Sequence, residues 1–251
     1  MIDFDQKERV IRLQDTIHVN LPGVKMVAHR GVSGLERENT CAAFVAAGNR
    51  SYFGVETDIH RTADGQYIVF HDDNLVRLLG DERVVEETTF DDLRALRLTD
   101  LDGNARGDLL LPTLEEYVHI CKKYDKDCVL EIKNHFEPED IDNVIAIIRE
   151  IGWLERTVFI SFDLPNMICI REKLPQQRAQ YLVFDFTDDL IGILTSHHLD
   201  LDIKYSSLSA EQVRACHEAG IEVNVWTVND AADAERLAGY GVDFITSNIL
   251  E

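Results

Sequence analysis

Residues 54–72, with the sequence GVETDIHRTADGQYIVFHD, contain the feature that decides between fold classes. A run with strand character, Gly54–Asp58, is followed within a few residues by a second β-rich run that leads to His71. The Asp64-Gly65 pair between them is a strong signal for a tight hairpin turn. The connection is far too short for the crossover helix that a parallel neighbour requires. We therefore expect this strand to fold back on itself before the next parallel strand begins.

The hairpin also predicts which side chains meet at its open end. Setting Ala63 opposite Gln66 across the turn, and continuing the pairing outward, places Asp58 opposite His71. Glu56 and Asp58 are two residues apart, so they share one face of the strand. The hairpin is therefore expected to bring a histidine close to two carboxylates.

Outside this hairpin, short strand-like runs alternate with amphipathic helical segments. Helix start signals support the alternation, such as the capping-box pair Thr113 and Glu116 that opens TLEEYVHICKKY. Eight strands separated by helices in 251 residues indicate an α/β fold, a (β/α)8 TIM barrel, with an open doubly wound sheet as the alternative. The predicted parallel strands are Val24–Ala28, Gly54–Asp58, Cys128–Ile132, Thr157–Ser161, Gln180–Val183, Leu201–Lys204, Glu222–Trp226 and Val242–Thr246.

We expect one barrel domain over residues 1–251, with two additions. Residues 72–111 lack a long core-facing strand and are expected to form a small insertion over the barrel mouth. Residues 1–24 are expected to form an N-terminal extension. Only five residues follow the last predicted strand, so an ordinary eighth helix is missing. The extension is expected to cover that gap or to plug the bottom of the barrel.

Composition narrows the class of partner. A formal net charge of −21 argues against nucleic-acid binding, which needs a basic surface to displace counterions from phosphates. Five scattered cysteines without a CxxC pair are typical of reduced thiols, and no apolar run approaches the ~20 residues that span a bilayer. The charged N-terminal segment lacks the apolar core of a signal peptide. We therefore expect a cytoplasmic protein that acts on a small molecule; the oligomeric state stays open.

Chemically active side chains stand at the carboxyl ends of the predicted strands, which converge on one mouth in a barrel. The third predicted strand, within CVLEIKNH, alternates so that Val129, Glu131 and Lys133 share a face. The complete set consists of His29 and Arg30 after the first strand, Glu56 and Asp58 on the second, His71 after the hairpin, and Glu131 and Lys133 at the end of the third.

Three inward carboxylates, Glu56, Asp58 and Glu131, would repel one another in one mouth. One divalent cation would remove that repulsion, and oxygen ligands favour Mg²⁺ or Ca²⁺, or alternatively Mn²⁺, over Zn²⁺. The alternative to a metal site is a network of ion pairs with Arg30 and Lys133.

A cation, two histidines and two basic side chains around one pocket point to phosphoryl chemistry. Arg30 and Lys133 would hold phosphate oxygens and stabilise the charge that develops in the transition state. Of His29 and His71, one would activate the attacking oxygen while the other protonates the leaving alkoxide. The residues leave open which histidine has which role. A phosphodiester suits this arrangement better than a monoester, because its alkoxide leaving group needs an acid.

The ordered motifs HRG, ENT, ETD, HDDNL, LPTLEE, LEIK, ISFD and VNVWTVN resemble the glycerophosphodiester phosphodiesterase family over about Lys25 to Ser247. The resemblance implies a (β/α)8 barrel with an insertion after the HD motif, and hydrolysis of glycerophosphodiesters to sn-glycerol 3-phosphate and an alcohol. It leaves open whether water or the glycerol 2-hydroxyl attacks. The roles that it implies are acid/base catalysis for His29 and His71, metal binding for Glu56, Asp58 and Glu131, phosphate contacts for Arg30 and Lys133, and an aromatic wall near the glycerol for Trp226.

In the family, a proline usually precedes ENT, an arginine followed by threonines stands after the HD motif, and ITD with a nearby proline ends the last strand. This chain has Arg37-Glu38 before Asn39, RLLG after the HD motif, and ITSN at the end of the last strand. These departures concern the alcohol group of the substrate and the shape of the insertion. Glu38 and Asn39 are expected to cap the first helix, with Thr40 as the alternative cap.

Two other functions stay open. One is a lipid phosphodiesterase of the lysophospholipase D or sphingomyelinase D kind, acting on long-chain substrates. Such an enzyme would need an apolar rim, for which the insertion offers Leu78, Leu79, Leu109 and Leu110. The other is a binding module without catalysis on the same barrel, which would have no need for a poised pair of histidines.

Overall fold

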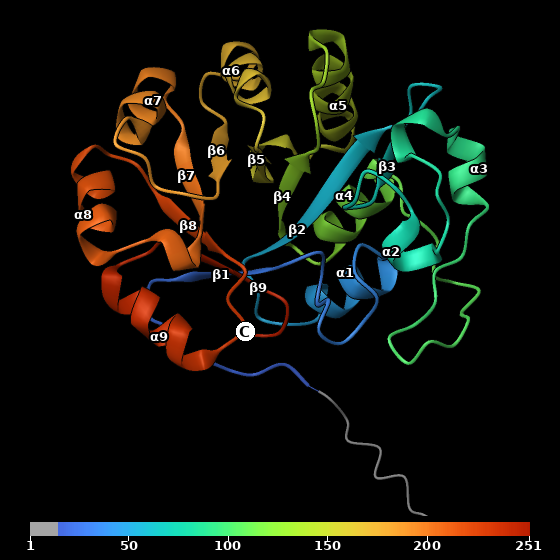
Figure 1. Ribbon diagram of the computed structural model, residues 1–251, viewed down its shortest axis with the longest axis horizontal. Coiled ribbons are helices and arrows are strands. Elements are labelled where there is room, and N and C mark those ends of the chain that lie inside the picture. Colours follow the sequence, from blue (N-terminus) through green and yellow to red (C-terminus); the bar gives the residue numbers. More distant parts are fainter. Residues whose placement is uncertain (1–14) are drawn as a thin grey trace, which may run out of the picture.

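The computed structural model describes residues 15–251 and forms a closed barrel of parallel strands with helices around it (Figure 1). Each strand pairs with the next around the barrel, and pairing of β1 with both β9 and β2 closes it. The predicted TIM barrel is confirmed, and the open sheet is wrong. Its parallel strands are β1 (Lys25–Ala28), β2 (Gly54–Arg61), β4 (Asp127–Ile132), β5 (Thr157–Ser161), β6 (Arg178–Val183), β7 (Asp200–Lys204), β8 (Val223–Trp226) and β9 (Phe244–Ser247).

The helices cover the outside of the barrel, and their apolar faces pack against the strands in the main hydrophobic core. The predicted capping box is present, because the Thr113 hydroxyl accepts from the Glu116 amide and the Glu116 carboxylate accepts from the Thr113 amide. The outer helices are α1 (Cys41–Gly48), α4 (Leu114–Lys123), α5 (Pro138–Ile151), α6 (Leu164–Lys173), α7 (Leu190–His197), α8 (Ala210–Glu218) and α9 (Ala231–Tyr240).

The predicted hairpin joins β2 to the antiparallel strand β3 (Tyr67–Val69), but its predicted register is wrong by one residue. Thr62, not Ala63, pairs with Gln66, and the Asp58 carbonyl accepts from the amide of Phe70. The reason is the turn: Gly65 adopts φ +81°, which gives a loop of three residues instead of two. His71 is therefore the second residue beyond the end of β3 rather than the direct partner of Asp58.

Strand β2 is longer than the barrel wall and has two neighbours along one edge. Its first residues pair with β1, and Ile59–Arg61 pair with β3. On its other edge, β2 pairs with β4 over Gly54–Ile59, so that Asp58 lies beside Glu131. One strand thus carries the barrel wall at its start and the hairpin at its end.

Residues 72–111 have a small hydrophobic core of their own on the β3 side of the barrel (Figure 1). The segment contains α2 (Val76–Leu79), a 3-10 turn at Val85–Glu87 and α3 (Phe90–Arg94). Its two ends meet, because the Val69 amide donates to the Pro112 carbonyl at 2.8 Å. The buried residues of this core are Ile68, Phe70, Leu75, Val85, Leu93, Leu98, Leu109 and Leu111.

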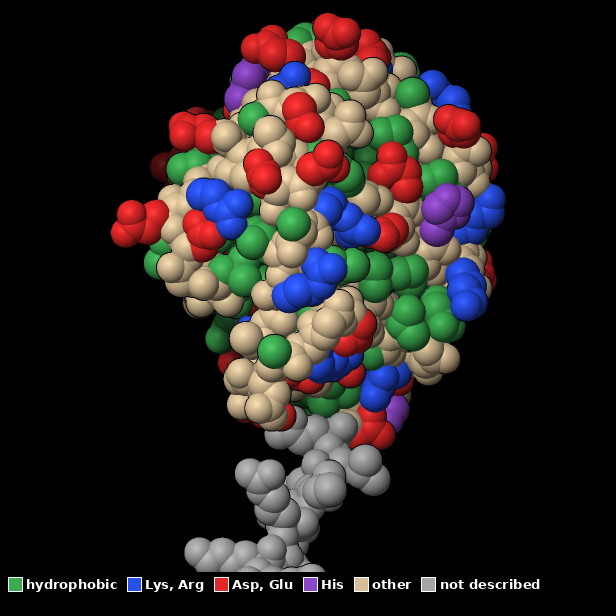
Figure 2. Space-filling view, turned by 90° about the vertical axis from the view of Figure 1, so that its right-hand side faces the viewer, with side chains coloured by type: hydrophobic (Ala, Val, Ile, Leu, Met, Phe, Trp, Pro, Cys, Tyr) green, Lys and Arg blue, Asp and Glu red, His purple; other side chains and the backbone are tan. Residues whose placement is uncertain are grey.

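On the face that carries this segment, acidic and basic side chains lie close together, with hydrophobic side chains between them (Figure 2). Arg106, for example, forms ion pairs with Glu36, Asp100 and Asp108. Within residues 15–251, no helix is both long enough and apolar enough to cross a membrane.

The predicted extension 1–24 is described from Asp15 onward, and residues 1–14 lie outside the described part. Ile17 pairs with Leu250, and the Val19 amide donates to the Glu251 carbonyl at 2.8 Å. The extension therefore runs beside the last residues of the chain. The division of the chain into barrel, extension and insertion stays a proposal.

Candidate active site

A pocket opens at the carboxyl ends of the strands. Six of the eight predicted site residues line it, and the other two, Asp58 and Lys133, contact that lining. The lining residues are His29, Arg30, Glu56, His71, Glu131, Ile160, Phe162, Leu182, Asp202, Trp226 and Thr246.

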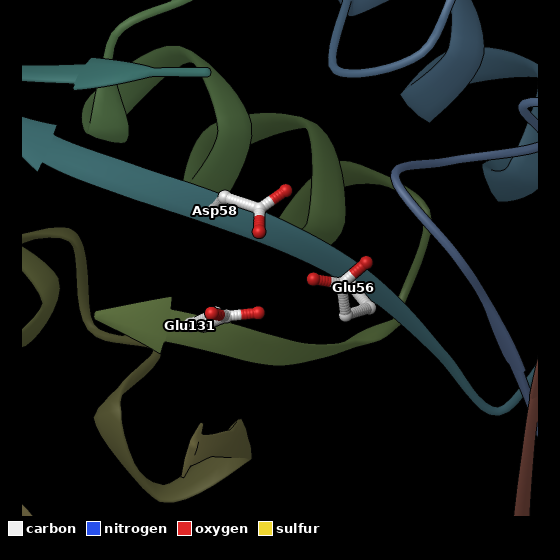
Figure 3. Close-up of side chains that lie close together, drawn as sticks. All are labelled: Glu56, Asp58 and Glu131. Carbon is white, nitrogen blue, oxygen red and sulfur yellow. The ribbon is translucent and has the colours of Figure 1, made fainter. Parts of the chain in front are cut away.

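Three carboxylates, those of Glu56, Asp58 and Glu131, point toward one another from β2 and β4 (Figure 3). One oxygen from each lies within 4.8 Å of the others, and all three residues are buried. The parallel pairing of β2 with β4 produces this arrangement, because it sets Asp58 beside Glu131 while Glu56 lies on the same face as Asp58.

Two cations accompany the carboxylates. Lys133 Nζ donates to Glu131 Oε1 at 2.7 Å and lies 3.6 Å from Asp58 Oδ1. Arg30 Nε lies 3.7 Å from Asp58 Oδ2, and its backbone amide donates to Glu56 Oε2 at 2.8 Å. The ion pairs considered as an alternative to a metal are thus present, but two cations face three acids.

The pKa values of the three acids differ, because the two cations act mainly on Asp58. Burial and the charge of Asp58 raise the pKa of Glu131 to about 8 and that of Glu56 well above its usual range. Burial would also raise the pKa of Asp58, but Arg30 and Lys133 outweigh it and hold that pKa below the usual range. Without a further cation, the group retains protons at neutral pH.

The donor set fits a hard divalent cation. Asp58 Oδ1 is buried and has no hydrogen-bond partner among the described residues, so its desolvation is not offset by a hydrogen bond. Oxygens from three carboxylates lie close enough to be ligands of a single ion. The structure therefore supports the predicted ligand set in geometry and chemistry.

His29 follows β1 directly and is partly buried in the lining of the pocket. Its Nδ1 lies 2.7 Å from Asn248 Oδ1, which also accepts from the Ser33 hydroxyl at 2.9 Å. An amide oxygen only accepts, so Nδ1 carries the proton and Nε2, which is 3.9 Å from Glu56 Oε2, holds a free lone pair. Burial, reinforced by the charge of Arg30, lowers the pKa of His29 to about 4.

His71 is oriented by its neighbour in sequence. Its Nδ1 lies 2.6 Å from Asp72 Oδ1, and a carboxylate oxygen accepts, so Nδ1 carries the proton here as well. Burial lowers the pKa of His71, whereas the charge of Asp58 opposes this change. Both imidazoles are thus fixed through Nδ1, which leaves Nε2 as the atom that can exchange a proton.

Helix α1, which follows the segment after β1, has a different N-cap from the one predicted. Thr40, the alternative cap, is the N-cap of α1, and its hydroxyl accepts from the Ala43 amide. The prediction of Glu38 and Asn39 as caps was wrong, because their side chains form hydrogen bonds with residues at the pocket instead. Asn39 Nδ2 donates to Asp58 Oδ2 at 2.8 Å, and Glu38 accepts from Arg30 Nη1 at 2.8 Å.

Gly31 is expected to reject a side chain. It has φ +76°, and a Cβ there would lie 2.6 Å from the backbone carbon of Ala43 in α1. We expect Gly31→Ala to lower the free energy of unfolding by about 2 to 4 kcal/mol, since left-handed strain and overpacking add. Urea denaturation measures this. Gly220→Ala is the control, with φ +78° and no atom within 4 Å; equal losses in both variants would contradict the packing argument.

Three aromatic rings form one side of the pocket mouth. Phe162 and Phe184 are stacked with ring centroids 4.8 Å apart, and both meet Trp226 edge to face. Phe184 is 57% exposed. The four leucines of the insertion do not form the expected apolar rim, because none lines the pocket: Leu109 is fully buried, Leu78 and Leu79 pack against the small core, and Leu110 is partly buried.

A buried acid that the sequence did not single out lies on the pocket floor. Asp202 Oδ2 accepts from Asn224 Nδ2 at 3.1 Å, and its Oδ1 has no hydrogen-bond partner among the described residues. Burial, with the charge of Glu131, raises the pKa of Asp202 well above the usual range. Its position in the alternation of β7 is the one sequence signal that could have indicated it.

Comparison with known proteins identifies the family. Residues 29–250 match the model of the glycerophosphoryl diester phosphodiesterase family. A glycerophosphodiester phosphodiesterase of Caldanaerobacter subterraneus is 27% identical over 232 residues, covering 89% of this chain and 93% of that protein. Glycerophosphodiester phosphodiesterase 1 of Bos taurus is 32% identical over 263 residues, covering 91% of this chain and 79% of that protein.

A solved structure extends the similarity to the fold. A phosphodiesterase of Oleispira antarctica in complex with the product sn-glycerol-3-phosphate is 26% identical, covers 90% of this chain and 93% of that one, and superposes with a TM-score of 0.80. The family expected from the motifs is confirmed. Since one family model spans residues 29–250 and a solved phosphodiesterase shares the barrel, this chain is an enzyme of the glycerophosphoryl diester phosphodiesterase family.

Proposed function

We propose that the protein hydrolyses glycerophosphodiesters to sn-glycerol 3-phosphate and an alcohol, with His29 and His71 as the general acid and base. One observation carries the proposal: two imidazoles with fixed Nδ1 atoms line the same pocket as Glu56 and Glu131, two members of the cluster of three carboxylates. The product complex of the Oleispira antarctica relative supports the identity of the phosphate-bearing product.

We propose that Glu56, Asp58 and Glu131 hold one divalent cation, Mg²⁺, Ca²⁺ or Mn²⁺. When bound, such a cation supplies a Lewis acid for a phosphate oxygen and positive charge for the anionic transition state. Arg30 and Lys133 contribute fixed positive charge beside it, at positions where non-bridging phosphate oxygens need partners. Trp226 offers an apolar wall to the carbon atoms of the glycerol.

The two histidines divide the proton transfers. One Nε2 accepts the proton of the attacking oxygen as the P–O bond to the leaving group weakens. The other Nε2 must carry a proton when the diester is bound, although the pKa of both rings is lowered in the unbound protein, and it donates that proton to the oxygen of the departing alcohol. Asn248 holds the ring of His29, and Asp72 holds that of His71, so neither proton transfer requires the ring to be reoriented.

The test is release of sn-glycerol 3-phosphate from glycerophosphocholine by the purified protein, with and without EDTA. Release that EDTA abolishes and Mg²⁺ or Ca²⁺ restores supports the proposal. Release that EDTA leaves unchanged contradicts the metal assignment. No release from a panel of glycerophosphodiesters contradicts the function and leaves a binding module.

A second candidate is cleavage of long-chain lysophospholipids. The exposed Phe162 and Phe184 at the mouth favour it, because they offer apolar contact area beyond the pocket. Activity on lysophosphatidylcholine without activity on glycerophosphocholine would select this function over the first one.

Binding of the cation is expected to release protons. Burial and the charge of Asp58 raise the pKa of Glu131 to about 8, so this acid is largely protonated at pH 6 and must ionise to bind a metal, and they shift the pKa of Glu56 in the same direction. The apparent affinity should therefore rise from pH 6 to pH 8, by close to tenfold per unit for each proton displaced. Titration calorimetry in two buffers of different ionisation enthalpy measures the proton count. Glu131→Gln should lower that count, and an affinity independent of pH would contradict the prediction.

A further inference from the structure

Arg77 lies on α2 in the insertion and binds two acids at the edge of the pocket. Its guanidinium makes two hydrogen bonds to Asp72, at 2.6 and 3.2 Å, and two to Glu38, at 2.8 and 2.7 Å. The two acids come from different parts of the chain, since Asp72 follows the hairpin and Glu38 precedes α1. One planar group therefore joins two segments through paired contacts, which arginine makes and lysine does not.

Each of these acids holds a residue of the proposed catalytic machinery. Asp72 Oδ1 is 2.6 Å from Nδ1 of His71 and fixes its ring. Glu38 Oε1 accepts from Nη1 of Arg30 at 2.8 Å as well as from Arg77. An unbroken chain of hydrogen bonds thus runs from His71 through Asp72, Arg77 and Glu38 to Arg30.

The hydrogen bonds of Arg77 fix the orientation of the Asp72 and Glu38 carboxylates. Arg77 occupies both oxygens of Asp72, so the carboxylate cannot rotate without breaking a hydrogen bond to Arg77. The same holds for Glu38. Burial would raise the pKa of both acids, but Arg77 and Arg30 lower that of Glu38 to about 2, and Arg77 and His71 lower that of Asp72. Both carboxylates are therefore ionised and accept hydrogen bonds from these partners.

We propose that Arg77 is a positioning residue of the diesterase reaction: it fixes Asp72 and Glu38, and through them the imidazole of His71 and the guanidinium of Arg30. This inference rests on the proposed function. It also gives the insertion a part in catalysis, because the hydrogen-bond chain from His71 to Arg30 passes through Arg77 of α2.

The chain offers a matched control. Arg106 also makes four hydrogen bonds, to Glu36, Asp100 and Asp108, and also joins the insertion to the segment before α1. None of its partners contacts His71 or Arg30 in the described structure. If attachment of the insertion were the whole role of Arg77, then Arg77→Met and Arg106→Met would have the same effect.

The experiment compares the steady-state kinetics and Tm of these two variants. Arg77→Met is expected to lower kcat/KM by about 10- to 100-fold, the usual effect of removing a group that orients a functional side chain. Arg106→Met is expected to stay within about twofold of the wild type, with a similar Tm, because partly exposed ion pairs contribute little to stability. Arg77→Lys should fall between Arg77→Met and the wild type.

Two further variants separate the branches. Asp72→Asn should lower kcat more than it raises KM, because His71 is the only one of the two pocket residues that Asp72 contacts directly. Glu38→Gln should mainly raise KM for the diester, because Glu38 directly contacts Arg30 and not His71, and Arg77→Met should show both effects. The ring ¹⁵N shifts of His71 provide a readout without turnover: the wild type should show a protonated Nδ1, and Arg77→Met a mixture of tautomers.

The outcomes are distinct. Equal activity of Arg77→Met and wild type, or equal losses in the Arg77 and Arg106 variants, overturns the inference. If Arg77→Met does not fold, Arg77→Lys against Arg106→Lys gives the same comparison. A wild type without diesterase activity contradicts the proposed function instead, and the ¹⁵N shifts then still decide whether Arg77 fixes His71.

Discussion

Replacing His71 with alanine is expected to lower kcat for a glycerophosphodiester by about 10²- to 10⁴-fold, and His29→Ala is expected to have an effect of the same size. Each variant removes one of the two proton transfers that the diester needs. The double variant should be little slower than either single one, because residues that act as a unit do not contribute additively. Initial rates of sn-glycerol 3-phosphate release at saturating substrate measure all three.

The control is His135→Ala, since His135 is exposed and lies outside the residues that line the pocket. We expect its rate to equal that of the wild type. Rates near the wild-type value for His29→Ala or His71→Ala would show that the ring concerned moves no proton in the reaction. Circular dichroism confirms that each variant is folded before the rates are compared.

Asp58→Asn is expected to be the most damaging single change among the acids, with a loss of about 10³-fold or more in kcat/KM. Asp58 is the acid that Arg30 and Lys133 keep ionised, and it provides the buried oxygen without a hydrogen-bond partner. The amide keeps the size of the side chain but removes its charge, so the proposed cation site would lose a charged ligand and several kcal/mol of transition-state stabilisation.

Calorimetric titration with Mg²⁺ or Ca²⁺ tests the same variant without turnover, and the metal affinity of Asp58→Asn should fall with its activity. Asp140→Asn is the matched control, because Asp140 is also buried but pairs with Arg61 outside the pocket lining. Undiminished metal affinity in Asp58→Asn would remove this residue from the ligand set.

Most of the barrel could be predicted from the sequence. Parallel strands that are covered on both faces consist of short runs of β-branched residues, and here these runs lie between helix start and stop signals. Thr157–Ser161, for example, matches the predicted strand at both ends. The site followed from the same pattern, since the carboxyl ends of barrel strands meet at one mouth and place Glu56 near Glu131 although 75 positions separate them.

The errors came from turns and caps. The hairpin register depended on whether the loop used two or three residues, and the Asp-Gly pair is compatible with both. His71 nevertheless reaches the pocket, because it lies beyond the paired residues and the register of β3 does not fix its direction. Asn39 was interpreted as a local cap, whereas its amide is used by Asp58, a partner that only the tertiary fold provides.

Other residues were missed because nothing local distinguishes them. Asn248 holds His29 from 219 positions away, and no pattern in ITSN indicates that contact. Phe184 looks like an ordinary apolar residue after a strand until Phe162 is seen stacked on it. Such pairings depend on how neighbouring strands end, which periodicity does not encode.

The meeting of Val69 with Pro112 has a consequence for how this family can diversify. Residues between them leave and rejoin the fold at one point, outside the closed ring of strands. Lengthening the insertion costs only a small additional loss of chain entropy and breaks no hydrogen bond between the barrel strands. The segment between Val69 and Pro112 is therefore a suitable place for insertions, provided that each variant keeps a guanidinium where α2 now supplies one.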